Sequence, residues 1–277
     1  MEIRSRLRYA WGDDRAGQLG RGSEEAAAAA KARSPRKAAI AKQRDDDFAA
    51  APGVLAFFER RGAWVRTLAC GLHHTLAVAW EPRGDDAVTA RLYSWGFGDN
   101  GRLGTGATGA QSFPARVLLP LGDDPTSGHV TAVAAGDQHS LALLSDGTVF
   151  AWGDNSHGQL GLGKATGRPV EMPEEVRLRT HEGAATRVAC GARHSGCVTS
   201  SGAVLLWGFS DEGQLGLGPE VAELESTQRD VTALPLEAPL MDDGRRGGRW
   251  NAEALGLGVR HTVVLSPRGY YADESRR

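Results

Sequence analysis

Four histidines recur in the sequence within one short pattern, and histidine is the side chain that titrates closest to neutral pH and often binds metals. The pattern is G-x-x-H-[S/T], and it contains His74, His139, His194 and His261. A catalytic or metal site needs one asymmetric cluster, whereas equivalent positions in successive repeats lie apart. We therefore expect the four histidines to be structural, with each imidazole bonding a neighbouring backbone group at a tight turn.

Acidic and amide residues also recur, within a second pattern and shortly after the Trp-Gly with which it begins. They are Asp13-Asp14, Asp99-Asn100, Asp154-Asn155 and Asp211-Glu212. Their spacing does not match a calcium-binding loop, so we expect them to form Asx-type turns. The sequence contains no nucleophile elbow, no phosphate-binding P-loop and no zinc-protease helix motif. We predict that the chain is not an enzyme and has no catalytic residue, cofactor or metal.

The second pattern is W-G-x4-G-[Q/R]-L-G, and it alternates strictly with the histidine pattern. Its copies begin at Trp11-Gly12, Trp95-Gly96, Trp152-Gly153 and Trp207-Gly208. Each copy is followed two residues later by one more glycine, at Gly22, Gly106, Gly163 and Gly218, and with these more than half of the 37 glycines among the 277 residues belong to the repeat. Glycine in such fixed places indicates turns with positive φ and close approach of strands. We expect the four tryptophans to pack between successive units.

Each unit is predicted to hold three or four short antiparallel strands. Ser140–Ser145 and Thr148–Trp152 flank Asp146-Gly147, which is typical of a type I′ hairpin. Val130–Ala134 precedes them as a further strand, and Ala115–Leu119 is expected to form an outer strand. Because so small a sheet cannot bury both of its faces alone, radial stacking of the units predicts an all-β propeller with four recognisable blades.

The two patterns resemble the repeat of the regulator of chromosome condensation family, most clearly in the stretch W-G-D-N-S-H-G-Q-L-G that starts at Trp152. The resemblance covers all the regular parts of the chain and implies a β-propeller. Family propellers normally have seven blades, so four copies predict a small ring, an open arc or part of a longer propeller. The first and last strands could complete one blade between them, although Gly269–Ala272 would compete for that position.

We interpret residues 1–277 as a single propeller domain with two irregular stretches. Residues 21–62 form a low-complexity insertion with predicted helices at Glu24–Lys31 and Ser34–Lys42, and residues 219–248 form a long loop. Within the insertion, Lys31–Arg44 forms a basic arm with six basic side chains and no acidic one, at Lys31, Arg33, Arg36, Lys37, Lys42 and Arg44. They could bind a partner through its phosphates, but the polyalanine tract beside them is of low complexity and has no aromatic residue to stack on bases, which favours a solvated loop.

Composition limits the remaining possibilities. Lysine and arginine number 32 against 34 acidic residues, and this balance disfavours a protein built around nucleic-acid backbone contacts. Nucleic acid could bind only through the basic arm. Neither a membrane-spanning run nor a secretory signal is present, so we expect a cytoplasmic or nuclear protein without membrane contact. Cys70, Cys190 and Cys197 have no zinc spacing and predict no disulfide.

These observations favour a non-enzymatic protein-interaction propeller that binds a protein partner through loops on one face. The family resemblance implies an alternative, a guanine-nucleotide exchange factor for a small GTPase. A third possibility is a propeller segment of a multidomain protein such as a ubiquitin ligase. The sequence does not discriminate between a scaffold and an exchange factor, because a loop that displaces nucleotide needs no catalytic side chain.

Overall fold

The computed structural model describes residues 9–22, 48–84, 87–121, 128–163, 165–178, 183–216, 232–237 and 252–266. Only the backbone is described at residues 11, 48–54 and 232–237. The predicted helices at Glu24–Lys31 and Ser34–Lys42, the basic arm between Lys31 and Arg44, and the predicted strand at Gly269–Ala272 lie outside the described residues.

The fold is all-β, as predicted, and its unit is a four-stranded antiparallel blade. Blade 1 contains β3 Trp64–Cys70, β4 His74–Arg83, β5 Ala87–Gly96 and β6 Gln111–Val117. Blade 2 contains β7 Val130–Ala135, β8 His139–Leu144, β9 Val149–Gly153 and β10 Val170–Val176. Blade 3 contains β11 Ala185–Cys190, β12 His194–Thr199, β13 Val204–Gly208 and β14 Thr232–Glu237.

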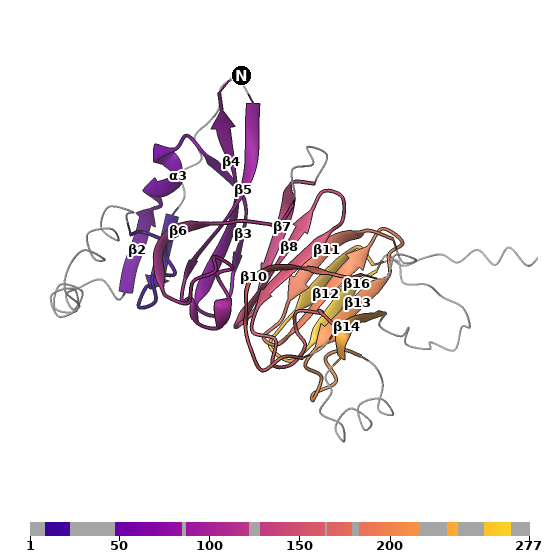
Figure 1. Cartoon of the computed structure of the whole chain (residues 1–277). Helices are drawn as coiled ribbons and strands as arrows, with labels where there is room; N and C mark the ends of the chain where they lie inside the picture. The colour runs from indigo at the N-terminus through magenta and orange to yellow at the C-terminus, as the bar shows by residue number, and fades with distance from the viewer. Residues whose placement is uncertain are drawn as a thin grey trace, which may run out of the picture.

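Two half-blades flank the three complete ones. The N-terminal half-blade pairs β1 Tyr9–Asp13 with β2 Phe48–Val54, and the C-terminal half-blade pairs β15 Ala254–Leu257 with β16 Thr262–Leu265. The first strands of successive units, β3, β7, β11 and β15, contact one another in turn and form the inner side of the arrangement. The described chain is therefore an arc, with its two half-blades at opposite ends (Figure 1).

The central hairpin of each blade joins its second and third strands, as the sequence predicts, but its turn is of another type. A type I′ turn would need positive φ at both central residues. Gly147 has a φ of 89°, whereas Asp146 is not among the positive-φ residues. Gly147 N donates to Leu144 O at 3.1 Å, and Leu144 N donates to Thr148 O at 2.9 Å. Gly147 thus follows a turn whose central residues do not have positive φ. The hairpin loop is one residue longer than the two-residue loop of a type I′ turn.

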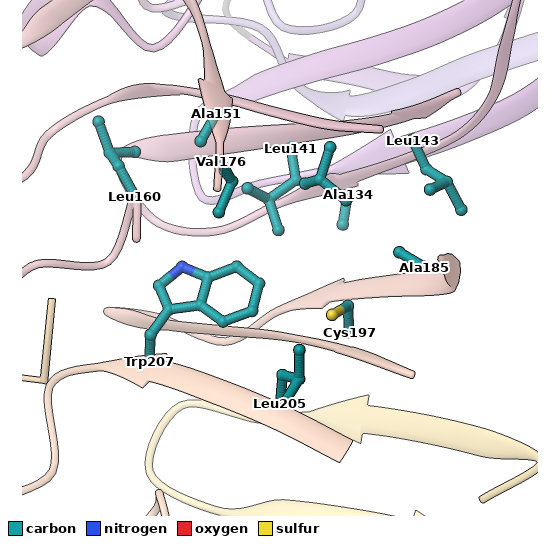
Figure 2. Packing of buried hydrophobic residues seen from close by; sticks show 11 residues of the cluster. Ala134, Leu141, Leu143, Ala151, Leu160, Val176, Ala185, Cys197, Leu205 and Trp207 are labelled. Carbon is teal, nitrogen blue, oxygen red and sulfur yellow. The ribbon is translucent and has the colours of Figure 1, made fainter. Parts of the chain in front are cut away.

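The core lies between blades rather than within one sheet. Leu141, Leu143 and Leu160 of blade 2 face Trp207 and Leu205 of blade 3, and all five are buried (Figure 2). The corresponding tryptophans Trp95 and Trp152 are also 1% exposed or less. Three of the four repeat tryptophans therefore pack in the positions that the repeat predicts. The side chain of Trp11 lies outside the described residues.

Regular structure extends into both stretches that the sequence marks as irregular. Residues 21–62 include strand β2 and the short helix α3 Ala56–Arg60, and residues 219–248 include strand β14. Phe58 of α3 is fully buried and packs edge-on against Tyr93, at a ring-centroid distance of 5.4 Å. It covers the face of blade 1 that carries Trp95. The apolar residues of Phe48–Val54 are thus a strand signal. It was missed because the spacing from Trp11 to Trp95 is longer than the later Trp-to-Trp spacings and so indicated an irregular insertion.

Candidate functional site

A hydrogen-bonded latch joins each complete blade to the next unit. The Nε2 atom of His139 in blade 2 lies 2.9 Å from Ser195 Oγ in blade 3, and that hydroxyl donates to the Gln159 carbonyl of blade 2 at 2.8 Å. Trp207 Nε1 donates to the same carbonyl at 2.9 Å. The latch therefore combines a histidine and a carbonyl from one blade with a hydroxyl and a tryptophan from the next.

The same arrangement recurs between blades 1 and 2. His74 Nε2 lies 2.9 Å from Ser140 Oγ, which donates to the Arg102 carbonyl at 2.8 Å, and Trp152 Nε1 donates to that carbonyl at 2.9 Å. Between blade 3 and the C-terminal half-blade, His194 Nε2 lies 3.2 Å from Thr262 Oγ1. The sequence predicts a neighbouring backbone group at the tight turn as the partner of each imidazole, and this prediction is wrong. The partner is a hydroxyl of the neighbouring blade, which relays the bond to a backbone carbonyl.

The latch fixes the tautomer of each histidine. The hydroxyl has one proton, which goes to the carbonyl, so the imidazole must donate from Nε2. Nδ1 of His74, His139 and His194 is buried and has no hydrogen-bond partner within the described part of the chain. Burial lowers the pKa of His74 to about 3 and the pKa values of His139 and His194 to about 4. These histidines are therefore neutral at physiological pH.

The glycine that opens the pattern leaves room for this imidazole. A Cβ on Gly136 would lie 2.2 Å from Cε1 of His139 and 2.6 Å from the Gly191 carbonyl of the next blade. Gly71 and Gly191 show the same two close approaches. The last glycine of the second pattern has a related role, since a Cβ on Gly104 would lie 2.6 Å from Trp152 Nε1. Glycine at these positions lets successive blades approach each other closely.

We expect Ser195→Ala to lower the free energy of unfolding by about 1–3 kcal/mol, because His139 loses the acceptor for its buried Nε2–H. Ser195→Thr is the matched control, since Thr262 holds the equivalent hydroxyl at the next junction. Urea denaturation at neutral pH would measure both. Equal stability of Ser195→Ala and the wild type would show that the latch is not stabilising.

Blade 1 departs from the repeat at Arg102, which stands where the other copies have Gln18, Gln159 and Gln214. The glutamines accept a bond within their own turn, for example from His157 N at 2.8 Å. Arg102 is 3% exposed and instead donates to the carbonyls of Asp99, at 2.8 Å, and Asp137 of blade 2, at 3.0 Å. The substitution of glutamine by arginine adds a direct bond between two blades.

Changing Arg102 to glutamine restores the repeat pattern and removes the bond to Asp137. We expect this variant to be less stable by about 1–2 kcal/mol, since the Asp137 carbonyl loses a charged donor. Arg102→Lys, which keeps the charge but has a shorter reach, should lose a smaller part of this free energy. Thermal and urea denaturation would rank the three proteins, and a more stable Arg102→Gln variant would contradict the assignment.

The turn residues after Trp-Gly bond their own backbone. Asp14 Oδ1 accepts from Leu19 N at 2.9 Å, and Asn155 Oδ1 accepts from Leu160 N at 3.2 Å. Asp154 Oδ1 accepts from Ser156 N at 3.1 Å. Among the residues that the structure describes, no cluster of three histidine, cysteine or acidic side chains could hold a metal ion. The hydrogen bonds of Asp14, Asp154 and Asn155 close the loops that follow Trp-Gly, on the face where the G-x-x-H turns also lie.

One cavity on this face joins blade 3 to the C-terminal half-blade. It measures about 350 Å³ and is lined by Asp137, Ala192, Arg193, Phe209, Asp211, Glu212, Val259 and Arg260. The Arg193 guanidinium lies 5.9 Å from the centroid of Phe209, and Arg260 pairs with Glu212 at 3.0 Å. Arg193 forms no ion pair within the described residues, and Val259 is 66% exposed. The cavity therefore presents a charged, partly apolar surface.

These lining residues belong to no site that the sequence predicts. A usable signal is present, because the pair of residues between Gly and His differs from copy to copy, although Arg recurs at the second position of the last two: Leu72-His73, Asp137-Gln138, Ala192-Arg193 and Val259-Arg260. The structure brings residues from three of these pairs together around the cavity, whereas the predicted partner-binding residues of the basic arm lie outside the described residues. Variable residues held on a constant frame are typical of binding surfaces.

Stacked four-stranded blades, inner first strands and inter-blade tryptophans define a β-propeller of repeat type. The model of the Regulator of chromosome condensation (RCC1) repeat matches residues 9–78, 90–143 and 146–198, and a second model of that repeat matches 130–159. The chain belongs to this family. Within the described residues, no helix is long and apolar enough to cross a membrane.

Similar proteins share the repeat but are longer. The chain is 36% identical over 209 residues to the human probable E3 ubiquitin-protein ligase HERC6, covering 74% of this chain and 18% of HERC6. It is 38% identical over 157 residues to the ultraviolet-B receptor UVR8 of Arabidopsis thaliana, covering 57% of this chain and 32% of the receptor. The solved structure of Prp20p from Saccharomyces cerevisiae, described with its binding to Gsp1p and histones, superposes with a TM-score of 0.63 at 24% identity, over 94% of this chain and 52% of Prp20p.

Proposed function

We propose that this chain is a non-enzymatic, regulatory protein-interaction module that binds a protein partner at the cavity around Arg193. The proposal rests on one observation, the contrast between the constant residues of the G-x-x-H turns and the changing residues between them. The Gly and His of each G-x-x-H turn are the same in all four copies, whereas the pair of residues between them differs from copy to copy, with Arg at the second position only in the third and fourth copies, as Arg193 and Arg260. The constant Gly and His are needed for blade packing, whereas the two residues between them can contact a partner.

The exposure of Arg193 and its position against Phe209 support a protein partner with an acidic group beside an apolar one, although the lining of the cavity also includes Asp137, Asp211 and Glu212. Arg193 is exposed and lies over the half-buried ring of Phe209, which restricts the freedom of its side chain. An arginine held this way can bind a carboxylate with two parallel hydrogen bonds. Val259 supplies exposed apolar surface on the same cavity. Arginine and aromatic side chains are the types enriched at binding hot spots.

The proposal is tested by affinity capture with the full chain and two charge-reversal variants. We expect Arg193→Glu to abolish capture of the partner, whereas Arg116→Glu, which reverses an exposed arginine on the outer strand of blade 1, should leave it unchanged. Circular dichroism would check that both variants fold. A partner retained equally by both variants would place the binding surface elsewhere.

Guanine-nucleotide exchange is the second candidate, and the family resemblance is what favours it. An exchange factor must bind the nucleotide-free GTPase more tightly than the nucleotide-bound form. We expect no acceleration of fluorescent-nucleotide release from a panel of small GTPases at micromolar chain. Acceleration of about 100-fold, equivalent to about 2.7 kcal/mol of barrier, would favour exchange over the scaffold function.

A further inference from the structure

The central hairpin of blade 1 is longer than those of the other complete blades, and its extension has an uncovered edge. β4 and β5 have ten residues each, whereas β8 and β12 have six and β9 and β13 have five. The outer strand β6 pairs with β5 only between Leu92 and Gly96. Within the described part of the chain, residues 87–91 of β5 therefore pair with β4 alone, and the hairpin projects beyond β6 (Figure 1). In blade 2, by contrast, the outer strand reaches Val149, the first residue of β9.

The backbone of this edge can bond another strand. Phe97 N donates to His73 O at 2.8 Å, and the bonds of an antiparallel ladder alternate along a strand, so the odd-numbered residues of β5 bond β4. Val88 and Ala90 consequently direct their N–H and C=O groups away from β4, toward the open edge. Pro82, which has no N–H, lies opposite Val88 and agrees with this assignment. An uncovered edge of this kind is a template for another strand.

A cavity of about 360 Å³ lies along this edge, in the plane of the sheet. It is lined by the successive residues 88–92 of β5 and by the successive residues 116–119, which end β6 and follow it. Successive residues of a strand point to opposite faces of a sheet, so a cavity over one face would contact only alternate residues. The cavity therefore occupies the place that β6 would fill if it continued beside β5.

The side of this cavity toward blade 2 is apolar. Ala90, Leu119 and Val130 line it and belong to the core cluster that blades 1 and 2 share. Trp80, which lies opposite Ala90 in the hairpin, packs edge-on against the ring of His129 at a ring-centroid distance of 5.5 Å. Apolar side chains of an added strand would be buried on this side.

The opposite side is basic. Arg91 lies two residues before Tyr93 on β5 and Arg116 lies opposite Tyr93 on β6, so both arginines point to the face that carries α3. Arg116 is exposed and Arg91 is half-buried, and neither forms an ion pair within the described residues. Glu81 lies on the same face, where it accepts a hydrogen bond from the Tyr93 hydroxyl. The two arginines outnumber this glutamate, so a strand beside them meets positive charge.

We propose that this edge binds an extended segment of a partner protein, which adds a strand to blade 1 in the place beyond β6. Alternate residues of such a strand face opposite sides of the sheet. Those toward blade 2 enter the apolar side of the cavity, and those toward α3 meet Arg91 and Arg116. The main chain supplies affinity and the two sides supply selectivity, so the segment alternates apolar residues with aspartate or glutamate.

This site is separate from the cavity around Arg193. The G-x-x-H turn of blade 1 precedes β4, whereas the open edge lies beside the hairpin at the far end of β4. The two sites thus lie at opposite ends of the blades. Variants at one site should not alter binding at the other.

The first test measures fluorescence anisotropy of a labelled synthetic peptide, V-E-V-E-V-E-V, with the full chain. We expect saturable binding, and binding at least about tenfold weaker for the block peptide V-V-V-V-E-E-E and for V-K-V-K-V-K-V. N-methylation of the valines, which face Val88 and Ala90 in the proposed pairing, keeps the side chains but removes the backbone donors and should abolish binding. Equal binding of the alternating and block peptides, or of the methylated peptide, would overturn the proposal.

The second test reverses a charge at the edge. Arg91→Glu should weaken binding of V-E-V-E-V-E-V at least about tenfold and strengthen binding of V-K-V-K-V-K-V. Arg193→Glu, at the other cavity, is the matched control and should change neither. The exchange of preference separates a lost contact from misfolding, because a misfolded chain would bind neither peptide. An Arg91→Glu variant that still prefers the glutamate peptide would contradict the proposal.

The third test addresses the backbone. Peptide binding should slow amide hydrogen exchange at Val88 and Ala90 but not at Thr89 and Arg91, whose N–H groups already bond β4. Val88→Pro removes one outward N–H and should weaken binding about threefold or more, whereas the control Val88→Thr keeps that N–H. Unchanged exchange at Val88 and Ala90 on saturation would show that the peptide does not add as a strand.

Two other occupants of the edge would give different results. Peptide binding that appears only after residues 122–127 are replaced by glycine and serine would mean that this segment of the chain fills the edge. A dimer in light scattering that Val88→Pro dissociates would mean that a second copy fills it. Either result contradicts the proposal.

Discussion

Lowering the pH from 7 to 5 is expected to reduce the free energy of unfolding by about 4 kcal/mol through His74 and His139 alone. Burial lowers the pKa of His74 to about 3 and that of His139 to about 4, so both stay neutral in the folded chain at pH 5. In the unfolded chain they titrate near pH 6.5 and take up protons below it. Because the unfolded state binds more protons, each histidine costs about 2 kcal/mol over this interval.

The sign and the pH window follow from the depressed pKa values. The stabilisation is fully present above pH 6.5, falls as the pH drops toward about 4 for His139 and about 3 for His74, and stops changing once the folded histidines are also protonated. Urea denaturation at a series of pH values would measure it. His139→Gln keeps an amide donor for Ser195 but cannot titrate, so it should remove about half of this pH dependence. Constant stability between pH 7 and pH 5 would refute the assignment.

The second large effect is expected for Gly136→Ala. The added methyl group would overlap the buried ring of His139, at 2.2 Å, and the Gly191 carbonyl of the next blade, at 2.6 Å. Neither neighbour can move without opening the junction between blades 2 and 3. We expect a loss of about 4 kcal/mol or more, in the range that marks a specific structural conflict.

Gly167→Ala is the matched control for this substitution. Gly167 lies in a loop, has no positive φ, and a Cβ there would meet nothing within 4 Å. We expect its stability to stay within about 0.5 kcal/mol of the wild type, as for other unobstructed surface positions. Circular dichroism during thermal melting would compare the three proteins. If the two alanine variants melted alike, close blade approach would not explain the glycine.

Much of the fold could be predicted from the sequence because its signals are local. The fixed spacing of Trp-Gly and G-x-x-H marks each strand and turn, and alternation of the two patterns gives the order of the strands. The burial of Trp95, Trp152 and Trp207 follows from the same repetition. Family membership needs no more than these motifs, and the absence of enzyme motifs is likewise a property of the sequence.

Tertiary structure decided everything that depends on contacts between units. The partner of His139 lies 56 residues away, at Ser195, and only the approach of one blade to the next brings the two together. The bond from Arg102 to Asp137, the cavity around Arg193 and the burial of Phe58 arise in the same way. Strand β2 was not predicted, because the long stretch after Gly22 separates it in the sequence from its partner β1. The motifs determined what each blade is, whereas the packing between blades determined what each side chain contacts.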